Sequence, residues 1–251
     1  MKKEEKEAEK TYNFIAEFYH NYRTKMNPRG WFYNEHLEMP MTLKLLGNIG
    51  GKKILDMGCG TGIYAKLLTK KGAKLKGFDI SDEMLKIARK DNPKLDLRKG
   101  SLYKIPFKEK FDIVYAALAM DYVPNWDKVF RNVSNVLKKN GIFIFSTGNP
   151  LAEMLKSVKV GEEKLKVFGI RNYFEEDKVH YSKWDLKNKK VRVPSYHKTY
   201  GTIVKTIVRN GFEIIDYEDT FPSKKSKKLF PEEYKQYSKY PYFCAFKLRK
   251  K

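Results

Sequence analysis

The chain has 251 residues, a length that suits one large α/β domain or two small ones. Hydrophobic residues make up 41% and aromatic residues 14%, which is enough for a substantial core and excludes a chain that is disordered throughout. The net charge is +22, and 43 of the 52 cationic residues are Lys. Because nucleic-acid recognition favours the Arg fork, we interpret this charge as a Lys-rich solvated surface.

Cysteine content and hydropathy indicate the compartment. Cys59 and Cys244 are too few and too far apart for a disulfide framework or a zinc site, so we expect a reducing environment and no metal. Residues 1–10 alternate in charge and lack the apolar segment of a signal peptide. No apolar run approaches the ~20 residues needed to span a bilayer. The sequence therefore predicts a soluble, cytoplasmic protein without a membrane span.

The first 46 residues predict a helical cap. Apolar residues fall at helical spacing from Tyr12 to Tyr22, and residues 1–10 look like a frayed, solvated start of that helix. Residues 27–30, with the sequence NPRG, predict a turn. A second helix is expected from about Pro40 to Leu46.

Strands and helices alternate in the remainder, residues 47–251. The expected strands span 53–56, 75–79, 95–99, 111–117, 142–146, 212–217 and 243–248, and the expected helices span 63–70, 82–89, 127–138 and 197–209. This alternation predicts an α/β fold of the Rossmann-like, doubly wound kind, with a mostly parallel sheet and helices on both faces.

Residues 150–196 interrupt this alternation. Within them, 178–185 and 191–193 flank Asn188 and predict a β-hairpin. An insertion at this position overhangs the carboxyl ends of the strands, where open α/β sheets bind ligands, so we expect it to form a lid. Further on, Lys224–Lys228 predicts a basic, solvated loop.

A glycine-rich stretch with two carboxylates gives the clearest chemical indication. Gly58, Gly60 and Gly62 follow a strand and precede a helix, so that the backbone can touch a ligand with no Cβ in the way. Their spacing, G-x-G-x-G, differs from the G-x-G-x-x-G of dinucleotide sites and makes a dehydrogenase a distant alternative. Asp56 would repel a diphosphate and suits a cationic or amino-acid ligand. Asp79 closes the next strand, where a carboxylate can accept hydrogen bonds from both hydroxyls of a ribose.

These segments resemble the class I S-adenosylmethionine-dependent methyltransferases. LDMGCGTG resembles the family's glycine-rich motif, and GFDIS with the EML that follows after one residue resembles its ribose and adenine segment. GSLYKIPF, FDIVYAALAMDYV and VLKKNGIFIFST resemble the next three blocks, in the family's order and spacing. The resemblance covers roughly residues 12–250 and is closest to the small-molecule branch, which includes quinone-biosynthesis enzymes.

The resemblance implies S-adenosylmethionine as cofactor and S-adenosylhomocysteine as its product. The cofactor site that it implies consists of Asp56, Gly58, Cys59, Gly60, Gly62, Asp79, Ile80, Met84, Ser101, Leu102 and Ala117. Asp79 would hold the ribose, and Ile80 and Met84 would flank the adenine. Ser101 departs from relatives that have an acidic residue bonding the adenine amino group, so adenine would be held there by backbone N–H groups and apolar contacts. The N-terminal segment would fold over the cofactor.

Two residues are candidates for catalysis. Asp121 stands where many relatives have His, a second departure, and the same position also suits a helix cap or a surface acid. His197 begins the helix after the lid, from where it would approach the opposite wall. We predict that both line the acceptor pocket, with Asp121 as the base or as an anchor for a cationic acceptor. For His36 and His180, a structural role and a place in the site both stay open.

The predicted function is transfer of a methyl group from S-adenosylmethionine to a small-molecule acceptor by in-line displacement. A first alternative is an RNA methyltransferase, which the charge of +22 suggests but the Lys-dominated cations disfavour. A second is a non-catalytic protein that binds S-adenosylmethionine, which the intact glycine motif disfavours. Because the variable lid builds the acceptor pocket, the sequence selects neither the acceptor nor the oligomeric state.

Overall fold

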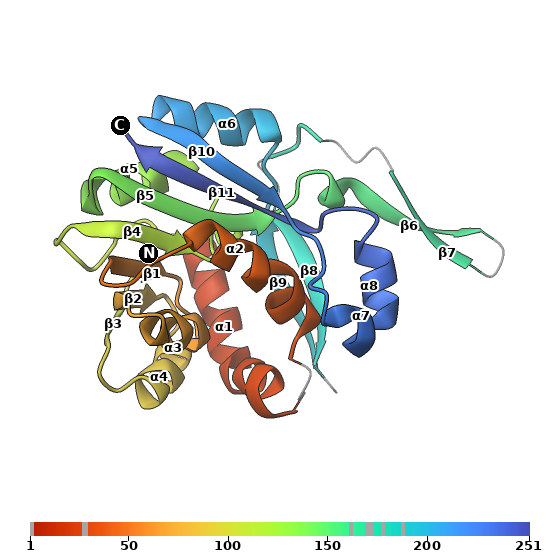
Figure 1. Cartoon of the computed structure of the whole chain (residues 1–251). Helices are drawn as coiled ribbons and strands as arrows, with labels where there is room; N and C mark the ends of the chain where they lie inside the picture. Colours follow the sequence, from red (N-terminus) through yellow and green to blue (C-terminus); the bar gives the residue numbers. More distant parts are fainter. Residues whose placement is uncertain (1–2, 27–29, 161–162, 169–172, 177–178, 187–188) are drawn as a thin grey trace.

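A seven-stranded sheet forms the centre of the computed structural model, which describes residues 3–26, 30–160, 163–168, 173–176, 179–186 and 189–251 (Figure 1). The strand order is β10-β11-β5-β4-β1-β2-β3, and β11 alone runs in the direction opposite to the other six strands. The strands are β1 (Lys53–Met57), β2 (Lys74–Asp79), β3 (Asp96–Lys99), β4 (Phe111–Ala116), β5 (Leu137–Gly148), β10 (Phe212–Asp219) and β11 (Phe243–Lys250). The prediction of a mostly parallel Rossmann-like sheet is confirmed.

Both faces of the sheet are buried, which explains why the central strands are short apolar runs rather than alternating ones. Along β1, Ile54 belongs to one hydrophobic cluster and Leu55 to another, and neither is exposed to solvent. In β4, the neighbours Ile113 and Val114 divide between the same two clusters. Since successive side chains point to opposite faces, the sheet has a core layer on each side.

Helices cover each face and the ends of the sheet (Figure 1). They are α1 (Lys3–Asn21), α2 (Met39–Leu46), α3 (Ile63–Lys70), α4 (Asp82–Asp91), α5 (Trp126–Val136), α6 (Tyr200–Arg209), α7 (Ser226–Leu229) and α8 (Pro231–Tyr237). Ser81 caps α4 by accepting a hydrogen bond from the Met84 amide, as a serine before a helix does. Residues of α5 and α6 join one core cluster, whereas α2 and α3 contribute to the other.

The N-terminal cap differs from its prediction at the start. Helix α1 begins at Lys3, and Glu5 and Ala8 are buried, so the expectation of a solvated start is wrong. The reason is tertiary, because α1 packs against α4 and the lid strand β9 (Lys189–Tyr196). The predicted turn at 27–30 falls largely outside the described residues. A π-helical segment, Phe32–Glu38, leads directly into α2.

The lid region contains two hairpins where the sequence predicted one. The predicted hairpin is confirmed as β8 (Val179–Leu186) paired with β9, although its turn at Asn188 lies outside the described residues. The unpredicted hairpin pairs β6 (Leu155–Val160) with β7 (Glu163–Phe168) and projects away from the sheet (Figure 1). The segment from Lys224 is not a solvated loop throughout, because it enters helix α7 and buries Ser226.

One boundary inside the sheet was also misplaced. The helix expected to continue to Lys138 ends at Val136, and β5 begins at Leu137 instead of Ile142. Leu137 pairs with Phe111 of β4 and is buried, so pairing across the sheet overrides the helical spacing of this segment.

Candidate active site

A cavity of about 1150 Å³ opens at the carboxyl ends of β1, β2 and β4. Its floor contains the glycine loop after β1, the end of β2 and the turn after β3. Helix α1, the loop after β5 and residues of β8 and β9 complete the wall. Of the eleven residues predicted for the cofactor, the cavity is lined by Asp56, Gly58, Cys59, Gly60, Asp79, Ile80, Met84, Ser101, Leu102 and Ala117.

Gly60 and Gly62 have different environments although both adopt left-handed backbone conformations. Gly60 has φ +53°, and a Cβ built on it would meet no atom within 4 Å, so this backbone is open to a ligand in the cavity. Gly62 has φ +77°, and its Cβ would lie 2.6 Å from Asn92 Nδ2 and 3.1 Å from the Ala88 Cβ. Gly62 therefore allows the close packing of the loop on α4. Contrary to its prediction as a cofactor-site residue, it does not line the cavity.

Asp79 anchors the glycine loop and faces the cavity. Its carboxylate accepts hydrogen bonds from the Gly60 amide at 2.8 Å and the Ser81 amide at 2.9 Å. Burial raises the pKa of Asp79, while these backbone hydrogen bonds act in the opposite direction. Each carboxylate oxygen keeps a further lone pair, so Asp79 can also accept hydrogen bonds from ligand hydroxyls.

Asp56 is a buried carboxylate with an unpaired oxygen. The residue is 2% exposed, and its Oδ2 has no hydrogen-bond partner among the described residues; the same holds for Thr61 Oγ1. Burial, reinforced by the negative charges of Asp79 and Glu38, raises the pKa of Asp56 to about 8. An unpartnered buried carboxyl group is unfavourable in isolation, so this site suits a ligand that brings a donor or a positive charge.

The turn after β3 meets the N-terminal helix. Ser101 Oγ donates a hydrogen bond to Glu5 of α1 and accepts one from the Tyr103 amide at 3.0 Å. Both Glu5 and Ser101 line the cavity, next to Leu102. Residue 101 is thus not acidic, but the carboxylate of Glu5, which is distant in sequence, contacts its side chain.

Helix α1 and strand β9 close over the same part of the cavity. Ile15 of α1 and Val193 of β9 pack in one hydrophobic cluster with Met84. The hydroxyl groups of Tyr12 and Tyr122 form a short hydrogen bond, and their rings meet edge to face with centroids 5.2 Å apart. The N-terminal segment therefore covers the cavity beside Met84, as the sequence led us to expect.

Asp121 also lines the cavity, in the short helix Met120–Tyr122 that follows β4. Its carboxylate accepts hydrogen bonds from the Thr147 hydroxyl and from the Gly148 amide at 3.1 Å. Burial and then the nearby charge of Glu153 raise the pKa of Asp121 to about 7. The group is therefore held rigidly on the cavity wall and titrates near neutral pH.

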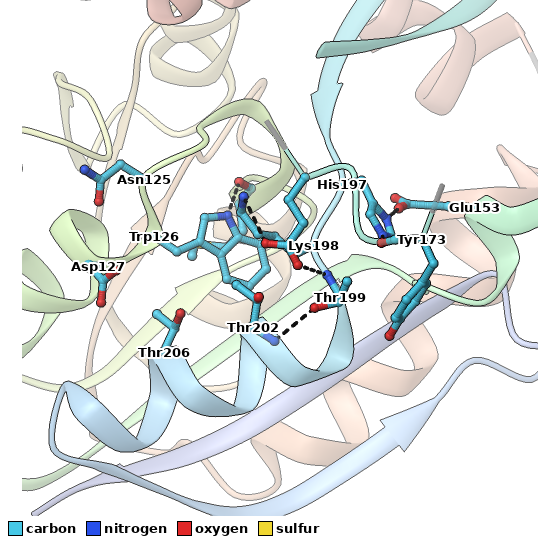
Figure 2. Close-up of polar contacts among 12 residues, drawn as sticks. Asn125, Trp126, Asp127, Glu153, Tyr173, His197, Lys198, Thr199, Thr202 and Thr206 are labelled. Carbon is cyan, nitrogen blue, oxygen red and sulfur yellow. Dashed lines mark hydrogen bonds and ion pairs between the residues drawn. The ribbon is translucent and has the colours of Figure 1, made fainter. Parts of the chain in front are cut away.

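His197 also lines the cavity, and both of its ring nitrogens are engaged (Figure 2). Nδ1 contacts the Glu153 carboxylate, and Nε2 lies 2.9 Å from the backbone carbonyl of Tyr173. Burial lowers the pKa of His197, but the hydrogen bond and charge of Glu153 outweigh it, so the net shift is upward. Since both partners are acceptors, the ring acts as a donor on each side, which favours positioning of Glu153 over acceptance of a proton.

His180 and His36, the two other histidines considered for the site, have different environments. His180 lines the cavity from β8. His36 does not line it, and its Nδ1 lies 2.9 Å from Ser223 Oγ, so this residue joins the cap to the segment before α7.

A buried network behind the cavity was missed by the sequence reasoning. Glu38 is fully buried and accepts hydrogen bonds from the Ser146 hydroxyl at 2.6 Å and from the Tyr64 hydroxyl. Ser146 Oγ in turn accepts the Leu118 amide at 2.9 Å. Leu118 lines the cavity with φ +50°, an uncommon conformation for a residue with a side chain. The network thus fixes the strained backbone of Leu118 in the cavity wall. The sequence did not indicate the network, because Glu38 is a single acidic residue in a helical segment.

The described residues contain neither a group of three or more His, Cys, Asp and Glu side chains arranged to hold a metal ion nor a helix long and apolar enough to cross a membrane.

Comparison with known proteins places this geometry in context. Residues 55–145 match a methyltransferase domain family. A protein of Haemophilus influenzae described as uncharacterised is 31% identical over 230 residues, covering 86% of this chain and 88% of that protein. A crystal structure of an S-adenosylmethionine-dependent methyltransferase from Mesorhizobium loti has a TM-score of 0.70 at 27% identity, covering 85% of this chain and 97% of that one.

A ubiquinone biosynthesis O-methyltransferase of Actinobacillus pleuropneumoniae is 30% identical over 154 residues. This match covers 56% of the chain and spans 66% of the relative's length, slightly less than two thirds.

Proposed function

Since this chain belongs to the class I S-adenosylmethionine-dependent methyltransferases, we propose that it methylates a small molecule bound beside Asp121. The protein is a methyltransferase, and S-adenosylmethionine is its cofactor. The observation that supports the proposal is that the glycine loop, Asp79 and Asp121 line one and the same cavity. A cofactor and an acceptor would therefore meet within a single cavity.

The residues of the cavity fit this cofactor. The unpartnered Oδ2 of Asp56 suits the ammonium group of the cofactor's methionine part. The open backbone at Gly60 leaves room for the rest of that methionine part. Asp79 would accept hydrogen bonds from the ribose, and Ile80 and Met84 would contact the adenine. When bound, S-adenosylmethionine supplies a methyl group on a positively charged sulfur, which departs as a neutral thioether.

Positioning is the main contribution that this chain makes to methyl transfer. Holding an acceptor at near-attack distance supplies ~7–11 kcal/mol in well-oriented reactions. Leu118, fixed by Ser146 and Glu38, forms a rigid wall where β4 ends, and Tyr122 with Tyr12 lines the cavity next to it.

Asp121 is proposed to accept a proton from the acceptor. A base contributes typically ~10²–10⁴-fold to a rate, most effectively when its pKa lies near the working pH. The pKa of about 7 meets that condition, and the bonds from Thr147 and Gly148 fix the carboxylate on the wall. An acceptor with a hydroxyl or ammonium group can donate to Asp121, whereas a carboxylate acceptor would be repelled. His197 is proposed to act indirectly, by holding Glu153 in place.

The proposal is tested by methyl transfer from a labelled cofactor to a panel of phenols, alcohols and amines. Asp121→Asn should reduce turnover of the accepted compound by at least tenfold and leave the dissociation constant of S-adenosylhomocysteine nearly unchanged. Asp216→Asn, the same substitution at an exposed position of β10, serves as the control. Tight cofactor binding without turnover of any acceptor would instead favour the non-catalytic alternative, and equal turnover by Asp121→Asn across the pH range would eliminate Asp121 as the base.

A further inference from the structure

The carboxylate of Glu5 occupies an unusual position for a residue so near the start of the chain. Glu5 is 4% exposed, lines the cavity and accepts the hydrogen bond of Ser101 Oγ. The two residues are separated by 96 positions in sequence. Because Glu5 lines the cavity beside Ser101, its carboxylate is placed where it can contact a bound ligand.

The order of the strands defines which part of the cofactor would reach Glu5. Strands β1, β2 and β3 are neighbours in that order, and the glycine loop, Asp79 and Ser101 follow them respectively. A ligand with its amino-acid part at the glycine loop and its ribose on Asp79 extends its base towards the turn after β3. Met84 lines the same cavity. The base would thus end beside Ser101 and Glu5.

We propose that Glu5 recognises the amino group of the cofactor's adenine, taking the place of an acidic side chain at position 101. The inference rests on the cofactor assignment of the proposed function. An ionised carboxylate offers about four acceptor positions, so Glu5 can accept the adenine amino group while it keeps the Ser101 hydroxyl. In hypoxanthine a carbonyl oxygen replaces the amino group. This oxygen is a hydrogen-bond acceptor, and it would face the carboxylate of Glu5, which is also an acceptor. Glu5 would therefore select adenine over hypoxanthine.

The contacts of α1 hold Glu5 at this position. One turn further along the helix, Glu9 accepts a hydrogen bond from Lys99 Nζ at 2.7 Å, and Lys99 is the last residue of β3. Two turns further, Asn13 Oδ1 accepts the Ser81 hydroxyl at 2.7 Å. Because the helix is docked on β3 and α4 by these bonds, binding of adenine to Glu5 would join the N-terminal helix directly to the cofactor.

The experiment compares two ligands that differ at one position of the base. Dissociation constants of S-adenosylhomocysteine and S-inosylhomocysteine, which has a carbonyl in place of the amino group, are measured by calorimetry. The wild-type chain should prefer the adenine compound by on the order of tenfold to a hundredfold, the range for a charge-assisted hydrogen bond. Glu5→Gln should abolish most of this preference, because its amide can donate to the carbonyl. Glu4→Gln, one residue earlier on α1 and outside the cavity lining, should retain it.

A second variant tests the position of the charge independently of helix α1. Glu5→Ala combined with Ser101→Asp returns a carboxylate to the turn after β3 and should restore the preference that Glu5→Ala removes. Unchanged discrimination in Glu5→Gln and Glu5→Ala, with S-adenosylhomocysteine still bound, would overturn the role of Glu5 alone. Failure of the wild-type chain to bind S-adenosylhomocysteine would instead contradict the cofactor site on which the proposed function depends.

Discussion

The buried Asp56 predicts an unusual dependence of stability on pH. Its folded-state pKa is raised to about 8, whereas an Asp in an unfolded chain titrates at about 3.9. Between these values the folded protein keeps a proton that the unfolded chain releases, so the free energy of unfolding falls as pH rises. Each pH unit in this range is worth about 1.4 kcal/mol, which amounts to up to about 4 kcal/mol by pH 7.

Asp56→Asn removes this titration while preserving the shape of the side chain. The variant without ligand should be more stable than the wild type at pH 7, by up to about 4 kcal/mol, and the difference should disappear near pH 4. The measurement is urea denaturation at several pH values, with Asp216→Asn as the control at an exposed position. Parallel pH profiles for wild type and Asp56→Asn would refute the reasoning.

The same substitution tests why a destabilising carboxylate is present. If the ammonium group of the cofactor binds Asp56, binding must ionise it, and a group with a pKa of about 8 then releases most of a proton at pH 7. Calorimetry of S-adenosylhomocysteine in buffers with different ionisation enthalpies reports this release. The wild type should show it and Asp56→Asn should not, with weaker binding in the variant. A heat of binding that is independent of the buffer would contradict this role of Asp56.

Three further predictions concern the ribose site, the glycine loop and the surface charge. Asp79→Ala should weaken S-adenosylhomocysteine binding by about 30-fold or more in calorimetry, since about two charge-assisted contacts are lost; wild-type preference for NAD would contradict the site. Gly62→Ala should lower the free energy of unfolding by ~1–3 kcal/mol through its contact with Asn92, whereas Gly60→Ala should mainly weaken cofactor binding. The reverse result would refute the different roles given to these two glycines. RNA binding should be weak and collapse with added salt, and methylation of a defined RNA position would favour the RNA alternative.

The sequence predicted the sheet and ten of the residues that line the cavity because both depend on local patterns. The glycine loop and Asp79 are set by residues close together in the chain, where turn chemistry and strand ends are readable. Both predicted ends of helix 63–70 are correct for the same reason. The predicted end of helix α5 was wrong because pairing of Leu137 with Phe111, a contact across the sheet, decides that boundary.

The parts of the site that were not predicted depend on contacts between distant segments. Glu5 and Ser101 lie 96 positions apart, and Glu38 and Ser146 lie 108 positions apart. Charge alternation made residues 1–10 look solvated, since nothing local distinguishes the buried Glu5 from the other acids of that helix. His197 was predicted to line the site, but its hydrogen bonds to Glu153 and Tyr173 were not predicted, because these residues are distant from it in sequence.

Charge distribution connects the cavity to the choice of ligands. The described lining residues include six carboxyl groups, one guanidinium and no Lys, although the chain contains 43 Lys in total. Two of the six, Asp56 and Asp121, hold a proton for much of the time at pH 7, and the other four give the cavity its negative charge. A negatively lined cavity within a positively charged molecule attracts a sulfonium cation more strongly than the neutral thioether that remains after transfer. The same field opposes entry of a phosphate backbone towards Asp121, even where the outer surface attracts it. The basic exterior is therefore weak support for an RNA substrate, and the acidic interior favours a small acceptor that is neutral or cationic.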